Sequence, residues 1–238
     1  MKDAHTFKFS KSFLLVPVVY LVSIWVIYFI EIQFNLNFNK YGVYPRTLEG
    51  FRGVFLTHFI HSNTSHLFNN SIPLFVLLSS LFYFYKEVAY KVLVLGGFFT
   101  GFITWIIARE SFHIGASGIV YLLFSFVFFS GMIRKHYRLV ALSLIIIFLY
   151  GSMIWFVLPI KEGMSWEGHL SGFLTGLLFA IIYRKKGIVR EEYQFKETDF
   201  DLLFDEQGNF APPKIEEVEE VEETPVNSEV HSDDKTLE

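Results

Sequence analysis

Six apolar stretches, each bounded by charged or turn-forming residues, constrain this chain more than any other feature. They cover about residues 12–32, 67–85, 90–108, 117–132, 139–158 and 169–183. A transmembrane helix needs about 20 predominantly apolar residues, so the longer stretches can span a bilayer. The shorter ones fit only if their ends lie in a protein-lined cavity, because lipid does not tolerate unpaired backbone groups. The pattern predicts an all-α polytopic membrane protein, a bundle of six transmembrane helices.

The composition agrees with a membrane protein. Of the 238 residues, 52% are hydrophobic and 19% aromatic, which exceeds the content of an ordinary soluble domain. Cysteine is absent, which excludes disulfides, thiolate metal sites and a cysteine nucleophile, so any nucleophile must be oxygen or nitrogen. We expect no cofactor, no metal and no nucleic-acid partner.

Charge divides the chain into two parts. Residues 1–190 carry 17 Lys and Arg against 7 acidic residues, whereas residues 191–238 carry 3 against 17. We therefore predict a short N-terminus at 1–11, a membrane domain at 12–186 and an acidic tail at 187–238 whose composition is typical of disorder. Apolar residues among the acids leave open a cytoplasmic binding partner or a short amphipathic helix: Phe195, Phe200, Leu202, Leu203 and Phe204.

Basic residues predict the orientation of the bundle. Twelve fall on one side: Lys2, Lys8, Lys11, Lys86, Lys91, Arg134, Lys135, Arg138, Arg184, Lys185, Lys186 and Arg190. The other side has five: Lys40, Arg46, Arg52, Arg109 and Lys161. By the positive-inside rule both termini are cytoplasmic, so the second, fourth and sixth stretches begin at the outer face.

Three polar clusters open these even-numbered stretches at a common depth. They are His66 to Asn70, the run Gly115-Ala116-Ser117-Gly118, and His169 with Gly172 and Gly176. Polar groups are costly at membrane depth, so the clusters predict one assembled site facing outward. A helix from Ser117 to Met132 rises only about 24 Å against a hydrocarbon core of roughly 30 Å, which places Ser117 below the surface. The site therefore needs a water-filled cavity, whose mouth Arg109, Glu110 and His113 could edge.

Serine with a nearby histidine is a pattern for nucleophilic catalysis. The Ser117 hydroxyl needs a base to take its proton, and His169 is the candidate. Flanking glycines leave the hydroxyl accessible, and the helix N-terminus offers free amides to an oxyanion. Each signal alone is weak, because serine is common in glycine-rich loops and because Gly172 and Gly176 can serve simply for close helix packing.

His66 and Asn70 lie four residues apart, so both side chains share one face of the second stretch. They can donate hydrogen bonds to an oxyanion, or they can tie this helix to its neighbours. Tyr121, one turn after Ser117, can pack on the His169 ring or form an ordinary core contact. His61 has less claim, since it lies in the preceding loop.

GxSG opening one membrane helix, His followed by GxxxG on a later one and HxxxN on an earlier one resemble the rhomboid family of intramembrane serine proteases. The order and spacing hold over about residues 45–185. The family's acid-x-Trp-Arg loop motif is approximated by Glu49-Gly50-Phe51-Arg52, with Phe in place of Trp. No seventh helix is evident, so the chain is similar to the six-helix bacterial form, in the inner (plasma) membrane.

The resemblance implies residue roles. Ser117 would be the nucleophile and His169 the general base, without a carboxylate. The oxyanion would accept hydrogen bonds from the Ser117 backbone amide and from the His66 and Asn70 side chains. Tyr121 would support His169. Gly115 would shape the loop, and the remaining glycines would allow helix packing: Gly118, Gly172 and Gly176.

The implied activity is an intramembrane serine endopeptidase that cleaves single-pass transmembrane proteins in or next to their membrane segments, through an acyl-enzyme. The alternative is a non-catalytic rhomboid-like protein that binds transmembrane helices. An ion-coupled transporter is less well supported, because Glu31, Glu87 and Glu110 all lie at segment ends.

Overall fold

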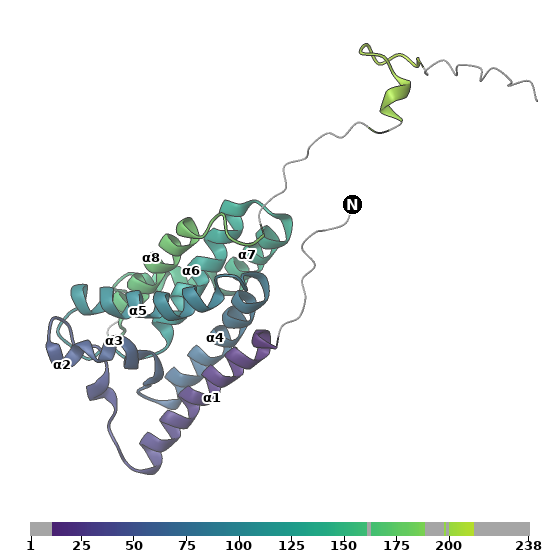
Figure 1. The fold of residues 1–238 in the computed structure, drawn as a ribbon. Coiled ribbons are helices and arrows are strands. Elements are labelled where there is room, and N and C mark those ends of the chain that lie inside the picture. The colour runs from purple at the N-terminus through teal and green to yellow at the C-terminus, as the bar shows by residue number, and fades with distance from the viewer. Residues whose placement is uncertain (1–10, 161–162, 189–197, 199, 212–238) are drawn as a thin grey trace, which may run out of the picture. The chain divides into compact units, whose positions relative to one another are not determined.

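The computed structural model describes residues 11–160, 163–188, 198 and 200–211. The chain divides into two compact units, Met1–Glu191 and Glu192–Glu238, which we treat separately. The first unit is helical (Figure 1). Its elements are α1 (Ser12–Gln33), η1 (Asn39–Tyr41), α2 (Leu48–Phe51), α3 (Gly53–Leu56), η2 (Thr57–Phe59), α4 (Thr64–Phe84), α5 (Ala89–Ile107), α6 (Ser117–Arg134), α7 (Tyr137–Tyr150), η3 (Gly151–Val157) and α8 (Trp166–Ile182).

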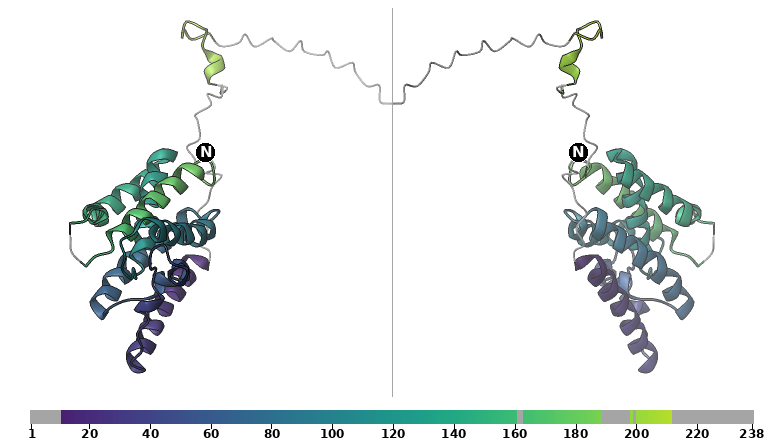
Figure 2. Two further views of the ribbon diagram at one scale, coloured as in Figure 1. Left: turned by 90° about the vertical axis from the view of Figure 1, so that its left-hand side faces the viewer. Right: turned by 90° about the vertical axis from the view of Figure 1, so that its right-hand side faces the viewer.

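Helix α6 is the centre of the bundle. In its apolar window 72% of the residues are buried, against 11% in α1. It packs against α4, α5, α7 and α8, whereas α1 packs on α4 at the periphery. Figure 2 shows α1 and α4 (purple and blue) side by side, with α8 (green) next to α6 (teal). A mostly buried α6 explains why residues at its N-terminus can be enclosed by several other helices.

Five helices are long and apolar enough to cross a membrane: Ser12–Gln33, Thr64–Phe84, Ala89–Ile107, Ser117–Arg134 and Tyr137–Val157. The sixth apolar helix, Trp166–Ile182, is shorter, at 17 residues. The described residues contain no strand, only two isolated bridges. The chain is thus an all-helical multi-pass membrane protein, with five spans by length and composition and a shorter sixth helix beside them.

The fifth apolar stretch is not one continuous α-helix. Helix α7 ends at Tyr150, and the chain continues as the 3-10 helix η3 from Gly151 to Val157. Gly151 has a low α-helix propensity, which favours the change there. Apolar periodicity does not distinguish the two helix types, so the sequence indicated a single helix.

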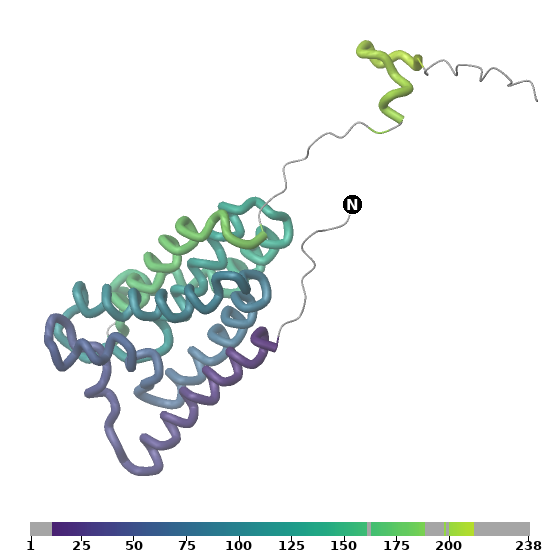
Figure 3. The backbone as a smooth tube through the Cα atoms, in the orientation of Figure 1, coloured from purple at the N-terminus to yellow at the C-terminus, as the bar shows by residue number. Residues whose placement is uncertain are grey.

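The connection between α1 and α4 is folded against the end of α5 (Figure 3). Thr47 caps α2 by accepting a hydrogen bond from Gly50 N at 3.1 Å. Trp105 of α5 donates its indole N–H to Thr47 O at 2.9 Å. Phe51, which stands where the family motif has Trp, packs edge-on against Trp105 at 5.5 Å. These contacts fix the first loop to the end of the bundle where α5 ends and α4, α6 and α8 begin, which we call the site end.

In the second unit the structure describes a short turn. It contains η4 (Asp201–Leu203) and a bridge between Phe204 and Phe210. The Asp205 carboxylate accepts hydrogen bonds from Gln207 N at 3.0 Å and Asn209 N at 2.8 Å. Phe195 and most of the predicted acidic tail lie outside the described residues.

Candidate active site

Glycines bring the N-terminal halves of α6 and α8 into backbone contact. A Cβ at Gly172 would clash with Gly118 O, and one at Gly176 would clash with Leu122 O. A Cβ at Gly118 would lie 3.5 Å from Gly168 O. Ser117 precedes Gly118 and His169 follows Gly168, so the two residues stand on facing first turns. The small-residue surface predicted from the sequence is therefore what brings the candidate nucleophile and base together.

The His169 ring is held from two directions. The Tyr121 ring stacks on it with centroids 4.3 Å apart and planes 15° apart. His169 Nδ1 lies 2.9 Å from Phe156 O in η3, and Tyr121 Oη donates to Met153 O at 2.8 Å. Because a carbonyl oxygen only accepts, Nδ1 carries the proton and Nε2 keeps a free lone pair. The 3-10 helix, which the sequence did not predict, thus fixes the tautomer that a general base needs.

Ser117 is the first residue of α6 and is partly buried. Within the described part of the chain, no hydrogen bond joins its hydroxyl to His169. Nucleophile–base hydrogen bonds are often looser without substrate, so the lack of this bond does not by itself exclude the pair. Ser117 lines a small pocket with Thr57, His58, Thr100, Gly101, Thr104, His113, Ile114, Gly115, Gly118, Ser165 and Gly168. His169, His66 and Asn70 are not among the residues that line this pocket.

Gly115 faces the two predicted oxyanion donors. Its φ of +118° favours glycine, and a Cβ there would lie 2.7 Å from His66 Nε2 and 3.7 Å from Asn70 Nδ2. The Asn70 side chain is buried, and its Nδ2 has no hydrogen-bond partner among the described residues. A buried donor without a partner costs about 1–3 kcal/mol, which a ligand oxygen could recover. His66, Asn70 and Gly115 therefore lie together, as the sequence predicted.

The loop that precedes Ser117, residues 108–116, is called the serine loop below. His61 contacts this loop more closely than the sequence indicated. It is buried, its Nε2 accepts the N–H of Ala116 at 3.3 Å, and its ring lies 5.1 Å from that of His66. Burial and, to a smaller extent, the neighbouring His66 together lower the pKa of His61 to about 4, so the ring is neutral and can accept. Its position five residues before His66 was the one available signal.

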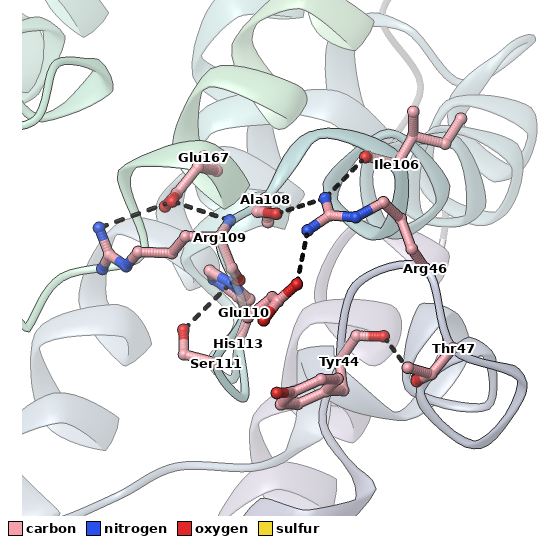
Figure 4. Close-up of polar contacts among 10 residues, drawn as sticks. All are labelled: Tyr44, Arg46, Thr47, Ile106, Ala108, Arg109, Glu110, Ser111, His113 and Glu167. Atoms are coloured by element: carbon pink, nitrogen blue, oxygen red, sulfur yellow. Dashed lines mark hydrogen bonds and ion pairs between the residues drawn. The ribbon is translucent and has the colours of Figure 1, made fainter.

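A polar network joins the loop after α5 to the first loop and to α8 (Figure 4). Arg46 donates to Ala108 O at 2.8 Å and pairs with Glu110 at 3.8 Å. Arg109 pairs with the buried Glu167 at 3.5 Å. The side chains of Arg109 and Glu110 are both exposed, and neither residue lines the pocket beside Ser117.

His113, the third residue expected at the mouth of the cavity, is buried and lines the pocket beside Ser117. It is only 3% exposed, because its backbone pairs with Val43 in both directions, at 2.8 and 3.0 Å. Burial lowers its pKa, more than the Arg109 carbonyl raises it. The sequence could not show the burial of His113, because Val43 and His113 are 70 residues apart in the chain.

The described residues hold no group of three or more His, Cys, Asp or Glu side chains that could bind a metal ion. The polar groups around Ser117 are hydroxyls, imidazoles and an amide. Their chemistry is that of proton transfer and hydrogen bonding.

The model of the Rhomboid domain family matches residues 49–186. The chain belongs to the rhomboid family. The matched region runs from the motif at Glu49 through the end of α8, so it includes every predicted site residue. Family membership and the helical fold agree on an intramembrane protein of rhomboid type.

Mycobacterial proteins are similar to this rhomboid. The uncharacterized proteins Mb1372 of Mycobacterium bovis and Rv1337 of Mycobacterium tuberculosis are each 31% identical over 180 residues, covering 68% of this chain and 72% of theirs. The uncharacterized protein ML1171 of Mycobacterium leprae is 30% identical over 142 residues, 55% of each chain. Members of the rhomboid family are generally intramembrane serine proteases, which directs attention to Ser117.

Proposed function

We propose that this rhomboid is a serine endopeptidase that hydrolyses peptide bonds in or next to the transmembrane segments of single-pass membrane proteins. Ser117 is the nucleophile and His169 the general base. The observation that carries the proposal is the tautomer of His169: Nδ1–H is held by Phe156 O, which leaves Nε2 as the basic nitrogen, on a helix turn that faces the first turn of α6. Such a ring can take the proton of a serine hydroxyl.

In the first step, Ser117 Oγ attacks the scissile carbonyl while His169 Nε2 takes its proton. The oxyanion receives hydrogen bonds from Asn70, His66 and the amide at the start of α6, and the proton passes from His169 to the departing amine. A water molecule, deprotonated by His169, then hydrolyses the acyl-enzyme and restores the serine. The small pocket that Ser117 lines leaves space for a water molecule at the start of α6.

The bundle has the six-helix form, and both termini are cytoplasmic in a bacterial inner membrane, as the distribution of basic residues indicates. The site then opens toward the outer face. A peptide bond inside a membrane helix is shielded by its own hydrogen bonds, so substrates with helices that unwind readily are preferred. A cytoplasmic partner for the acidic tail belongs to the same proposal, because the positive-inside rule assigns both termini to the cytoplasm.

The test uses purified full-length protein, a single-pass test substrate and a fluorophosphonate probe. We expect cleavage and labelling by the wild type, and neither by Ser117→Ala. His169→Ala should lose cleavage while eluting as a folded protein. A wild type that binds transmembrane helices but is neither labelled nor active would support the non-catalytic alternative, and cleavage by Ser117→Ala would refute the mechanism.

A further inference from the structure

Ser165 begins α8 but does not cap it. Serine is among the preferred N-cap residues, because its oxygen usually accepts an N–H of the first turn. Here Ser165 occupies the N-cap position of α8 and makes no side-chain cap hydrogen bond. Its hydroxyl instead lies 2.6 Å from His113 Nδ1, 52 residues away in the chain. The helix thus forgoes a local hydrogen bond in favour of one to the serine loop.

The hydrogen bonds of His113 fix the direction of this contact. Its Nε2 lies 3.0 Å from Arg109 O, and a carbonyl can only accept. Nε2 therefore carries the proton and Nδ1 accepts the hydroxyl hydrogen of Ser165. The ring is a neutral bridge with both nitrogens in use, and only 3% of His113 is exposed.

The backbone around His113 is anchored on its other side. Thr57 Oγ1 donates to His113 O at 2.6 Å, and Gly115 N donates to Thr57 O at 2.9 Å. The first loop therefore holds the backbone of the serine loop, while the side chain of His113 holds α8. Ser117 lies only four residues after His113, and His169 only four after Ser165.

A second contact joins the same two segments. Glu167 Oε1 lies 3.3 Å from Arg109 N and 3.5 Å from its guanidinium (Figure 4). Arg109 Nη2 also donates to Met164 O at 2.6 Å. Arg109 is about half exposed, so its ion pair is screened by solvent. The His113 ring is buried and its contact with Ser165 is partly buried, so this contact is screened less than the ion pair.

We propose that the His113–Ser165 hydrogen bond is a latch that fixes the serine loop against the helix carrying His169, and that both residues are positioning residues of the site. The inference rests on the proposed peptidase function. Neither residue touches the reacting atoms. Both line the pocket of Ser117, so their displacement changes the position of the nucleophile relative to its base.

The test compares Ser165→Ala, Ser165→Thr, His113→Phe and the double variant His113→Phe/Ser165→Ala, with Ser111→Ala as the matched control. Ser111 Oγ also contacts His113, at 3.3 Å, but on the Nε2 side, away from α8. We expect kcat and the fluorophosphonate labelling rate to fall together by about 10- to 100-fold in Ser165→Ala and His113→Phe, with KM unchanged, because a misplacement near 1 Å can cost about 100-fold. Ser165→Thr should retain activity, and the double variant should be no slower than the slower single variant.

Spin labels supply a measurement that does not depend on activity. The chain has no cysteine, so Phe112→Cys and Ile182→Cys, both at exposed positions, give a unique pair. The labels report the distance from the serine loop to the far end of α8, which is about 24 Å long from Trp166. We expect a broader distance distribution in Ser165→Ala than in the wild type, but not in Ser111→Ala.

The outcomes separate the two proposals. Unchanged rates and distances in Ser165→Ala, multiplied losses in the double variant, or equal losses in Ser165→Thr would overturn the latch while leaving the peptidase intact. A wild type that neither cleaves nor is labelled would overturn the peptidase function and, with it, the positioning role, whatever the distances show.

Discussion

Replacing Gly172 with alanine should separate the candidate nucleophile from its base. A Cβ at Gly172 would lie 3.1 Å from Gly118 C and closer still to Gly118 O, whereas carbon atoms pack at about 3.5–4.0 Å. Helices α6 and α8 must therefore move apart by about 1 Å. A displacement of that size costs about 100-fold in kcat, equivalent to about 2.7 kcal/mol of transition-state stabilisation.

Overpacking should also destabilise the fold by about 1–3 kcal/mol, so activity has to be compared at matched stability. Gly131→Ala is the control, because its Cβ would lie 2.9 Å from Leu139 C, at the opposite end of α6. Both variants are purified in detergent, and their Tm and their kcat on a single-pass substrate are measured. We expect similar losses of Tm, with the large loss of kcat confined to Gly172→Ala. Equal kcat values would refute the reasoning that the α6–α8 contact sets the catalytic distance.

Two further predictions follow from buried groups near the site. Asn70→Ala should lower kcat by about 10²–10³-fold with little change in KM, as expected for loss of an oxyanion donor. The control is Asn69→Ala, which should keep its activity because Asn69 is exposed. A loss of less than threefold in Asn70→Ala would exclude Asn70 as an oxyanion donor. His58 is buried and its Nε2 donates to Gly97 O at 3.0 Å, and burial lowers its pKa to about 4. Between pH 6.5 and 4 the unfolded chain binds a proton that the folded protein does not, so the free energy of unfolding should fall by about 3 kcal/mol as the pH falls through this range. Tm measured from pH 4 to 7 should therefore drop less steeply in His58→Gln than in the wild type, and equal slopes would contradict the assignment.

Helix positions were largely predictable from the sequence. The apolar stretch beginning at residue 117 and the helix beginning at Ser117 coincide, because burial in lipid or among helices requires apolar side chains along the whole segment. The start of α4 at Thr64 was placed a few residues late, since its first turn is polar and capped by Asn63, which accepts from His66 N at 2.8 Å. Polar caps carry no hydropathy signal.

The grouping of the site residues was also predictable in part. His66, Ser117 and His169 open the second, fourth and sixth apolar stretches, which predicted that they lie at one end of the bundle. The four-residue separation of His66 and Asn70 predicted that both lie on one helix face. Spacing within one helix reports which side chains share a face, but it says nothing about contacts between loops. His61 and His113 were therefore underrated, because their partners, Ala116 and Ser165, lie more than 50 residues away in the chain.

The sequence by itself determined a helical membrane protein and the end of the bundle at which its polar clusters gather, and it singled out the residues proposed as nucleophile and base. Those features depend on side-chain polarity and on helical periodicity, which are local. Only the tertiary structure decided which nitrogen of His169 is basic, which donors face Gly115, and how Ser165 forgoes its cap for His113. Each of these depends on a backbone carbonyl or side chain brought in from a distant segment, and such pairings are fixed only when the helices pack.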